Sequence, residues 1–236
     1  MSNITKGLNV IIGENVSFGE NVSIGHNVII YDGTQIGNNV MIQDNVVIGK
    51  QPARAKNSIL PEVKKLPPTV IGNGVTIGTN SIIYANAVIA DDVFVADLAT
   101  IRERVTIGEK TIVGRGVAVE NDCQVGDYCK LETNCYITAY STIEDYVFIA
   151  PCVVTTNDNY MARSKERYDH FKGITVKKGG RIGANATILP GKTIHEDGAV
   201  AAGSVVTKDV QNGSIVCGVP AKSLRQVPDA QLLKNQ

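Results

Sequence analysis

The sequence lacks tryptophan and contains only four phenylalanines in 236 residues, whereas glycine, valine and isoleucine are abundant. It also lacks any stretch approaching 18 apolar residues, so we expect no membrane span. The opening segment, MSNITKGLNV, does not have the charged-then-apolar pattern of a signal peptide. We therefore expect a cytoplasmic protein.

The five cysteines are odd in number and include no CxxC pair, which favours a reducing compartment over a disulfide framework. No excess of either charge is present, because 23 Lys and Arg balance 23 Asp and Glu and the pI is near 6.8. This balance argues against nucleic acid as the main partner. An apolar content of 43% is sufficient for a packed core.

A six-residue repeat runs through most of the chain. Each hexad has an aliphatic residue at position 1, a small residue at position 2, and a small or β-branched residue at position 5. Seven hexads follow one another from Ile12, beginning IGENVS, FGENVS and IGHNVI; fourteen run from Ile71 to Val154, and five from Val176 to Val205. Such a fixed period indicates a solenoid.

The period of six matches neither a helix nor an amphipathic strand over long runs. It fits a short strand followed by a sharp turn, so that three hexads make an 18-residue triangular coil and stacked coils pair their strands in parallel. Position 1 fills the interior, where each Ile or Val contributes roughly 1.5–3 kcal/mol. Gly, Asn and Asp at positions 2 to 4 suit tight corners. Cys123, Cys129 and Cys135 occupy position 5, which predicts core packing.

One column of the repeat departs from the rule that position 2 is small. Residues 18 apart stack on one edge, provided that the first interruption loops out without changing the register. That edge carries bulky or charged residues at positions 2 and 3, among them Tyr31, Tyr84, Arg102, Glu103, Glu120, Asn121 and Asn157. The other two edges carry mostly Gly or Ala at position 2. This edge is a candidate site, although Arg102 and Glu120 also suit a plain ladder of opposite charges.

Both interruptions of the repeat leave from this edge. The second is VVTTNDNYMARSKERYDHFKGITV, residues 153–176, and it starts five coils after the first. At about 4.8 Å per coil the two loops lie roughly 24 Å apart. The second loop therefore grows from the polar edge, where it can help to build a site.

The repeat resembles that of the hexapeptide-repeat acyltransferases over about residues 8–222. The resemblance implies an all-β fold: a left-handed parallel β-helix with two inserted loops and a short C-terminal extension. General crossover rules favour the opposite hand. We expect a β-helix domain over residues 1–222, loops at about 52–70 and 155–175, and a tail over 223–236 that adds a short helix or frays. The resemblance also implies a homotrimer with active sites between subunits.

Within that family, IRERVTIGEKTIVGRGVAVEN and YITAYSTIEDYVFIAPCVVTTNDNY look most like N-acyltransferases that modify UDP- or dTDP-linked amino sugars. This resemblance implies that a carboxylate, Glu120 first and Asp158 second, orients the amine and takes its proton. Asn157 and Asn159 would hold sugar hydroxyls or the oxyanion. The acceptor pocket would be lined by Tyr84, Asp97, Arg102, Glu103 and Asn121. Arg163, Lys165 and Arg167 would meet a pyrophosphate or simply be solvated.

The absence of a histidine after the strand that ends near Thr155 favours an amine acceptor. Galactoside and xenobiotic acetyltransferases have such a histidine, which acts as a base towards a hydroxyl; here the nearest is His170. Deprotonating a hydroxyl at neutral pH costs roughly 12 kcal/mol, and deprotonating an α-amino-like group only about 1–1.5 kcal/mol. Positioning alone can supply roughly 7–11 kcal/mol. The alternatives are an O-acetyltransferase with His170 as its base and a non-catalytic β-helix scaffold.

The segments IGANATILPGKTI, VAAGSVVTKDV and GVPAK resemble the coenzyme A groove of the family. The resemblance implies acetyl-CoA or another acyl-CoA as co-substrate, with the backbone at Ala184 and Ala202 pairing with pantetheine. Lys208 and Lys222 would approach the phosphates or the adenine. The small residues are also compatible with tightly packed corners alone. Hexapeptide carbonic anhydrases hold zinc with three histidines, and His26, His170 and His195 lack that spacing, so no metal is predicted.

Overall fold

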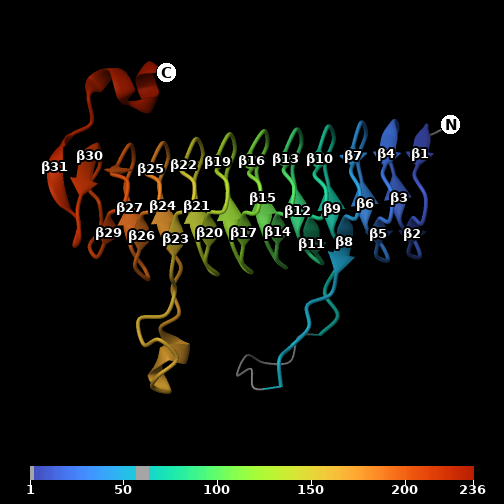
Figure 1. Ribbon diagram of the computed structural model, residues 1–236, viewed down its shortest axis with the longest axis horizontal. Coiled ribbons are helices and arrows are strands. Elements are labelled where there is room, and N and C mark those ends of the chain that lie inside the picture. The colour runs from blue at the N-terminus through green and yellow to red at the C-terminus, as the bar shows by residue number, and fades with distance from the viewer. Residues whose placement is uncertain (1–2, 57–63) are drawn as a thin grey trace.

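The computed structural model describes residues 3–56 and 64–236 and forms a three-sided parallel β-helix (Figure 1). Within these residues the strands make three sheets of twelve, ten and nine strands, here called sheets A, B and C. Most strands are two residues long, and every pairing is parallel except that of β30 with β31. This all-β architecture confirms the expected fold class and is consistent with the left-handed β-helix that the resemblance implies.

From β1 to β29, successive strands of the chain belong to sheets A, B and C in turn. Sheet A contains β1 (Ile4–Lys6), β4 (Val22–Ile24), β7 (Met41–Ile42), β10 (Thr76–Ile77), β13 (Phe94–Val95), β16 (Ile112–Val113), β19 (Lys130–Leu131), β22 (Phe148–Ile149), β25 (Arg181–Ile182), β28 (Ala199–Val200), β30 (Ser214–Cys217) and β31 (Lys222–Gln226). Sheet B contains β2 (Ile11–Ile12), β5 (Ile29–Ile30), β8 (Val47–Lys50), β11 (Ile82–Tyr84), β14 (Thr100–Ile101), β17 (Ala118–Val119), β20 (Tyr136–Ile137), β23 (Val154–Thr155), β26 (Thr187–Ile188) and β29 (Val205–Val206). Sheet C contains β3 (Ser17–Phe18), β6 (Gln35–Ile36), β9 (Val70–Ile71), β12 (Val88–Ile89), β15 (Thr106–Ile107), β18 (Gln124–Val125), β21 (Thr142–Ile143), β24 (Thr175–Val176) and β27 (Thr193–Ile194).

The first insertion does not change the register of the coils. Ile30 pairs with Ile48 and Ile48 with Ile83, although 35 residues separate the last two. Ile83 in turn pairs with Ile101, 18 residues later. The alignment of edges on which the sequence argument depended is therefore correct.

The core is a column of aliphatic side chains inside the prism. Ile48, Ile83 and Ile101 have no exposed surface, as expected for position 1 of the hexad. Position 5 is equally buried, and Cys123, Cys129 and Cys135 pack there as predicted. Burial raises the pKa of these thiols to about 12, 11 and 12 respectively, so they are protonated and unreactive at neutral pH.

The corners explain why asparagine and aspartate recur in the hexads. Residues at position 4 adopt a left-handed backbone, with φ of 55° at Asn15 and 60° at Asn80, which asparagine tolerates better than most residues. At position 3, side chains such as Asp32 accept a hydrogen bond from the backbone of the preceding coil, 3.0 Å from the Glu14 nitrogen. The polar corners are thus part of the stacking itself.

Both insertions leave from the corner that follows sheet B and project from the same side of the prism (Figure 1). The first follows β8, and its base is closed by Gln51, whose side chain exchanges two hydrogen bonds of 3.0 and 2.9 Å with the backbone of Leu66. The second follows β23, five strands further along sheet B, and contains the 3-10 helix η1 (Glu166–Asp169).

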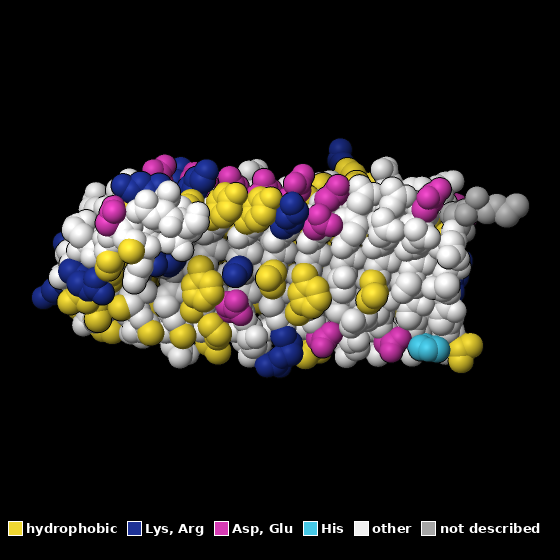
Figure 2. Space-filling model, turned by 90° about the horizontal axis from the view of Figure 1, so that it is seen from above, with side chains coloured by type: hydrophobic (Ala, Val, Ile, Leu, Met, Phe, Trp, Pro, Cys, Tyr) yellow, Lys and Arg dark blue, Asp and Glu magenta, His cyan; other side chains and the backbone are white. Residues whose placement is uncertain are grey.

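The C-terminal extension closes one end of the prism. β31 turns back antiparallel to β30, and η2 (Asp229–Gln231) and η3 (Leu233–Asn235) then lie over the last strands of sheet A. Hydrophobic side chains form an exposed row along the remainder of that sheet (Figure 2), which includes Phe94, Ile112 and Phe148. In the described part of the chain, no helix has the length and hydropathy needed to cross a membrane.

Candidate functional site

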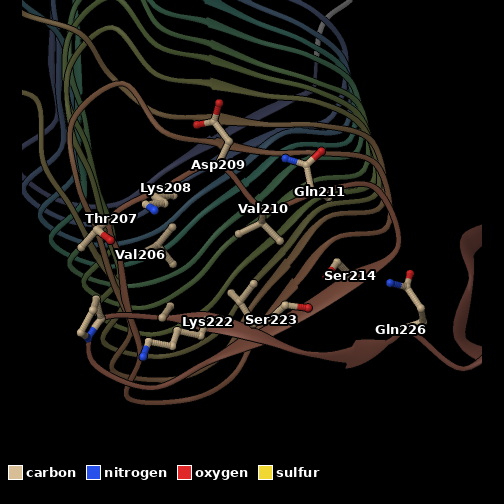
Figure 3. Close-up of a pocket in the computed structure, with 13 residues that line it drawn as sticks. Val206, Thr207, Lys208, Asp209, Val210, Gln211, Ser214, Lys222, Ser223 and Gln226 are labelled. Atoms are coloured by element: carbon tan, nitrogen blue, oxygen red, sulfur yellow. The ribbon is translucent and has the colours of Figure 1, made fainter.

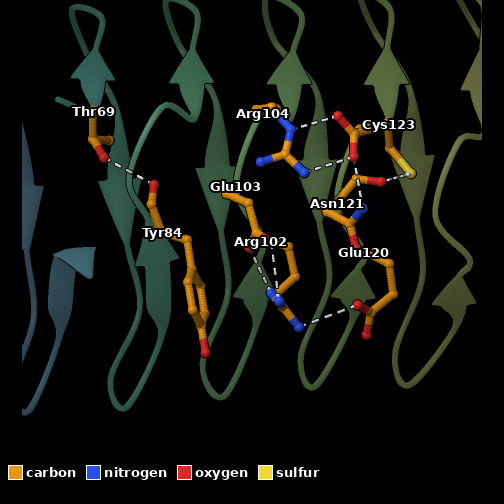
Figure 4. A network of polar contacts seen from close by, with 9 residues as sticks. Thr69, Tyr84, Arg102, Glu103, Arg104, Glu120, Asn121 and Cys123 are labelled. Carbon is orange, nitrogen blue, oxygen red and sulfur yellow. Dashed lines mark hydrogen bonds and ion pairs between the residues drawn. The ribbon is translucent and has the colours of Figure 1, made fainter. Parts of the chain in front are cut away.

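A ridge of polar side chains follows three neighbouring strands of sheet B. We define the ridge as Tyr84, Arg102, Glu103, Glu120 and Asn121, which come at the ends of β11, β14 and β17. These strands pair in register, so the side chains stack one coil apart (Figure 4). The sequence predicted this alignment from the 18-residue spacing alone.

Arg102 is the centre of the ridge. Its Nε and Nη2 atoms donate to the two carboxylate oxygens of Glu103 at 2.8 and 3.1 Å, and Nη1 lies 3.4 Å from Glu120 Oε2. The guanidinium also lies 4.8 Å from the ring centroid of Tyr84. Burial lowers the pKa of Arg102, but Glu103 and Glu120 more than offset this and raise it overall. Arg102 is therefore a fixed cation, and Glu103, only 4% exposed, is its paired anion.

Glu120 is less constrained than Glu103. Its side chain is 25% exposed, and its contact with Arg102 is long for a charge-assisted hydrogen bond. Within the described residues, its Oε1 atom has no hydrogen-bond partner. Glu120 can therefore present a carboxylate oxygen to an ammonium or amine while Arg102 holds the other oxygen.

A second ion pair lies beside the ridge and was not predicted from the sequence. Arg104 donates from Nε and Nη2 to both carboxylate oxygens of Asp122, at 2.6 and 2.8 Å. Asn121 Nδ2 donates to the same carboxylate at 2.6 Å. Burial raises the pKa of Asp122, but Arg104 and Asn121 outweigh it and leave the pKa below its ordinary value. The signal in the sequence was opposite charges 18 residues apart at position 4, a position we had assigned only to the turn.

Asp158 holds the second loop together and is poorly suited to act as a base. Its Oδ1 accepts from the Tyr160 nitrogen at 2.8 Å, and its Oδ2 accepts from the Ala162 nitrogen and from Arg167 Nη1, both at 3.0 Å. Burial raises the pKa of Asp158, but these donors outweigh it and lower the pKa overall. Because both oxygens are engaged, Glu120 is the better candidate of the two carboxylates.

His170 lies at the far end of the loop, directly after η1, and is exposed. Its ring stacks against that of Tyr160, with the centroids 5.9 Å apart. Among the described residues, no contact joins His170 to the ridge. Arg167, for which we had considered a pyrophosphate, instead pairs with Asp158 and packs against Tyr168 and Phe171.

Asn157 lies on the same edge as the ridge, two residues after β23. Its carbonyl accepts from the Lys172 nitrogen at 3.2 Å, which closes the stem of the loop and leaves the side chain available. Asn159 is exposed in the same loop. Asp97 lies elsewhere, at the corner after sheet A, where Oδ1 accepts from the Thr79 nitrogen at 2.8 Å. Asp97 therefore takes part in the hydrogen bonds between corners and is not part of the ridge.

Lys208 and Lys222 line a cavity of about 480 Å³ at the C-terminal end of the prism. Figure 3 shows both lysines towards one side of this cavity, away from Gln226. Lys208 follows β29 in sheet B, four strands beyond β17, so it lies roughly 19 Å along the prism from Glu120. The cavity and the ridge are therefore at two levels of the same edge.

Ala184 and Ala202 occupy the corner after sheet A, one coil apart, on the other side of sheet B from the ridge. At earlier coils of this corner an aspartate accepts the backbone N–H of position 3, as Asp97 does for Thr79. Alanine cannot do so, and in the described chain the N–H groups of Ala184 and Ala202 have no acceptor. These donors fit the amide carbonyls of a pantetheine arm.

The sequence model of the bacterial transferase hexapeptide repeat matches residues 16–50 and 68–103. The chain belongs to this family. The match lies in the N-terminal coils, and the further coils in the structure continue the same hexads to the C-terminal end.

Relatives of this family member include acetyltransferases. A 2,3,4,5-tetrahydropyridine-2,6-dicarboxylate N-acetyltransferase of Staphylococcus aureus is 46% identical over 55 residues, which are 23% of each chain, so the match spans about a quarter of that relative. A hexapeptide-repeat acetyltransferase of Vibrio cholerae, solved with acetyl coenzyme A, is 30% identical over 52% of this chain and 71% of its own, with a TM-score of 0.47. The UDP-N-acetylglucosamine acyltransferase of Arabidopsis is 18% identical over 95% of this chain and 71% of its own, with a TM-score of 0.47.

Proposed function

We propose that this protein is an acyl-CoA-dependent N-acyltransferase that transfers an acetyl or short acyl group to the amine of a UDP- or dTDP-linked amino sugar. The observation that carries the proposal is the carboxylate of Glu120, held on one side by Arg102 and free on the other, on an edge without a histidine base. The partial likeness to an N-acetyltransferase supports an amine as acceptor.

The donor side is formed by the C-terminal coils. Backbone N–H groups of Ala184 and Ala202 would hold the pantetheine amides, while Lys208 and Lys222 would bind the phosphates or adenine. CoA joins its thiol to its phosphates through a long flexible arm. The roughly 19 Å between the levels of Lys208 and Glu120 is a distance that such an arm can span.

On the acceptor side, Glu120 orients the substrate ammonium and takes its proton. The amine nitrogen then attacks the thioester carbonyl, and collapse of the tetrahedral intermediate breaks the carbon–sulfur bond and releases the thiolate, which takes up the last proton. Asn157 and Asn159 would donate to sugar hydroxyls or to the oxyanion. Tyr84, Arg102, Glu103 and Asn121 would line the acceptor pocket, with Arg102 fixing the positions of both glutamates.

The outward face of sheet B favours assembly into the homotrimer that the resemblance implies. Its outward positions carry no charge over ten strands: Ile11, Ile29, Val47, Ile82, Thr100, Ala118, Tyr136, Val154, Thr187 and Val205. The ridge borders one side of this face. The corner that contains Ala184 and Ala202 borders the other side. Packing of such faces around a threefold axis would bring the ridge of one subunit to the Ala184 corner of the next, which completes the site.

The proposal is tested by incubating the purified protein with acetyl-CoA and a panel of UDP- and dTDP-linked amino and hydroxy sugars, followed by mass spectrometry of the sugars. We expect an acyl group on amino sugars and none on the matched hydroxy sugars. Acylation of the hydroxy sugars that is lost in His170→Ala would instead support the O-acetyltransferase. No transfer and no thermal stabilisation by millimolar CoA would support the non-catalytic scaffold.

A further inference from the structure

Arg181 is a half-buried arginine, and two of its side-chain nitrogens are buried without a partner. It lies in β25, where Ile182 points into the core and Arg181 points outward, between Phe148 of β22 and Ala199 of β28. Its Nε and Nη2 atoms are inaccessible to solvent and have no hydrogen-bond partner within residues 3–56 and 64–236. Nη1 makes one long contact, 3.4 Å from Gln231 Oε1. Buried polar groups without partners are rare in folded proteins and call for a cause.

The unpartnered edge is the one with which Arg102 and Arg104 bind both oxygens of a carboxylate. Arg102 uses Nε and Nη2 to hold both oxygens of Glu103, and Arg104 uses the same two atoms to hold both oxygens of Asp122. These two nitrogens present parallel N–H groups, whose spacing matches the two oxygens of a carboxylate or phosphate. Arg181 therefore offers an oxyanion the same fork that is filled elsewhere by the protein's own acids.

A cavity of about 220 Å³ lies against Arg181, beneath the C-terminal segment. Phe148, Ala199 and Ile215 form its apolar lining, and the only polar side chains that line it among the described residues are Arg181 and Gln231. Its volume is several times the roughly 30 Å³ that one water occupies in the liquid, but it is below the range of pockets for drug-sized ligands. The cavity thus suits a small ligand with one anionic group.

The charges around the cavity favour an anion. Arg181 is the only charged side chain among the described residues that line the cavity. The C-terminal segment covers this part of sheet A, since the Leu233 nitrogen donates to Asp197 Oδ1 at 2.9 Å. The Gln231 side chain, which makes the long contact with Nη1, is itself exposed.

We propose that Arg181 and this cavity form a binding site for a small oxyanion, a carboxylate or phosphate group, separate from the ridge and from the Lys208 cavity. The anion accepts two parallel hydrogen bonds from Nε and Nη2, and the Gln231 side chain moves aside to admit it. The proposal does not depend on the acyltransferase reaction.

The test is a titration of the full-length protein, labelled with ¹⁵N-arginine, with inorganic phosphate and separately with acetate. We expect one Nε–H resonance, the one missing in Arg181→Lys, to shift and saturate with at least one of the two anions. The resonance of the exposed Arg115 serves as the control for weak surface binding. Because the signal comes from Arg181 itself, phosphate bound near Lys208 and Lys222 does not interfere.

Two variants separate a binding role from a structural one. Arg181→Lys keeps the charge but loses the fork, and we expect the anion affinity, followed at the Ala199 and Ile215 amides of uniformly ¹⁵N-labelled protein, to fall at least about tenfold. Gln231→Ala removes the contact at the entrance, and we expect affinity to be kept or increased. Failure of the Arg181 resonance to shift before that of Arg115, or equal affinities in the wild type and Arg181→Lys, would overturn the proposal.

Discussion

Glu120 and Asp158 show how two carboxylates near one edge acquire different capacities from their neighbours. Glu120 has a single long contact with Arg102, whereas Asp158 accepts from two backbone nitrogens and from Arg167. In the proposed reaction the first would exchange a proton with the substrate, whereas the hydrogen bonds of the second hold the shape of the loop. The sequence ranked Glu120 before Asp158 but could not supply this reason, because two of the three donors to Asp158 are backbone atoms.

Glu120→Gln tests the first of these roles. The amide keeps the shape of the side chain but cannot take a proton, so we expect kcat for acyl transfer to fall by about 10²- to 10⁴-fold, with little change in KM for acyl-CoA. The melting temperature should stay near that of the wild type, because the lost contact is long and partly exposed. Glu132→Gln, at the same hexad position on another edge, is the control and should retain full activity.

Asp158 makes the order of the second loop dependent on pH. Its folded pKa is depressed, so its contribution to loop order is complete above its unfolded pKa of about 3.9 and is lost as the pH falls through the lower folded value. We expect the Tyr160 and Ala162 amides to stay protected from hydrogen exchange in the wild type down to about pH 4. Asp158→Asn should remove this protection at neutral pH. Equal protection in both proteins would contradict the assignment.

The sequence did not predict the ion pair of Arg104 with Asp122 or the unpartnered side chain of Arg181. One physical reason explains both. A six-residue period specifies which positions face the core and which form corners, but not which corner side chains reach one another across coils. Arg104 meets Asp122 only because both adopt a left-handed backbone, with φ of 58° and 60°, at the same corner. The partner or lack of partner of a long cationic side chain depends on such local backbone geometry.

At the scale of the element, each hexad combines a strand with a corner that needs a positive φ. Asn80 and Leu98 occupy the same corner position in consecutive coils, with φ of 60° and 62°. Asparagine adopts this conformation with little strain, whereas in leucine it causes steric strain of roughly 1–2 kcal/mol. The Leu98 side chain is 51% exposed, so it gains little from packing in return.

Leu98→Asn should therefore raise the free energy of unfolding by about 1 kcal/mol. The reverse change at the preceding coil, Asn80→Leu, should lower it by a similar amount, which makes the two variants a matched pair. Urea denaturation followed by circular dichroism measures both. A loss of stability in Leu98→Asn would show that this leucine packs against something that the isolated chain does not contain.

The strands and the loop boundaries were largely readable from the sequence, because each hexad carries its own strand and corner. The hairpin of β30 and β31 could not be predicted from the sequence, because Lys222–Gln226 does not follow the hexad pattern and pairs antiparallel with β30. The tail, which we expected to add a short helix or fray, begins as a strand and then forms the short 3-10 helices η2 and η3. Tertiary pairing with the last coil decided the conformation there.

At the scale of the whole molecule, sheet B presents an uncharged outward face along the full length of the prism. If this face mediates trimerisation, Ile82→Asp near its middle should place three carboxylates at or near the threefold contact. We expect sedimentation equilibrium to show monomers, with loss of acyl transfer because the ridge and the alanine corner no longer meet. Thr106→Asp, an exposed outward position on sheet C, should leave the assembly intact. A monomeric wild type would contradict the proposed assembly.

The stacking of coils of equal height fixes the distances along the prism. The distance between the ridge and the Lys208 cavity is a whole number of coil heights, so it can change only in steps of about 4.8 Å. Coils before β11 lie outside that interval, and their gain or loss in evolution would leave the measured length untouched. Between β17 and β29, by contrast, a single added or deleted coil would change the distance between Glu120 and Lys208 by about 4.8 Å while every hexad still folded.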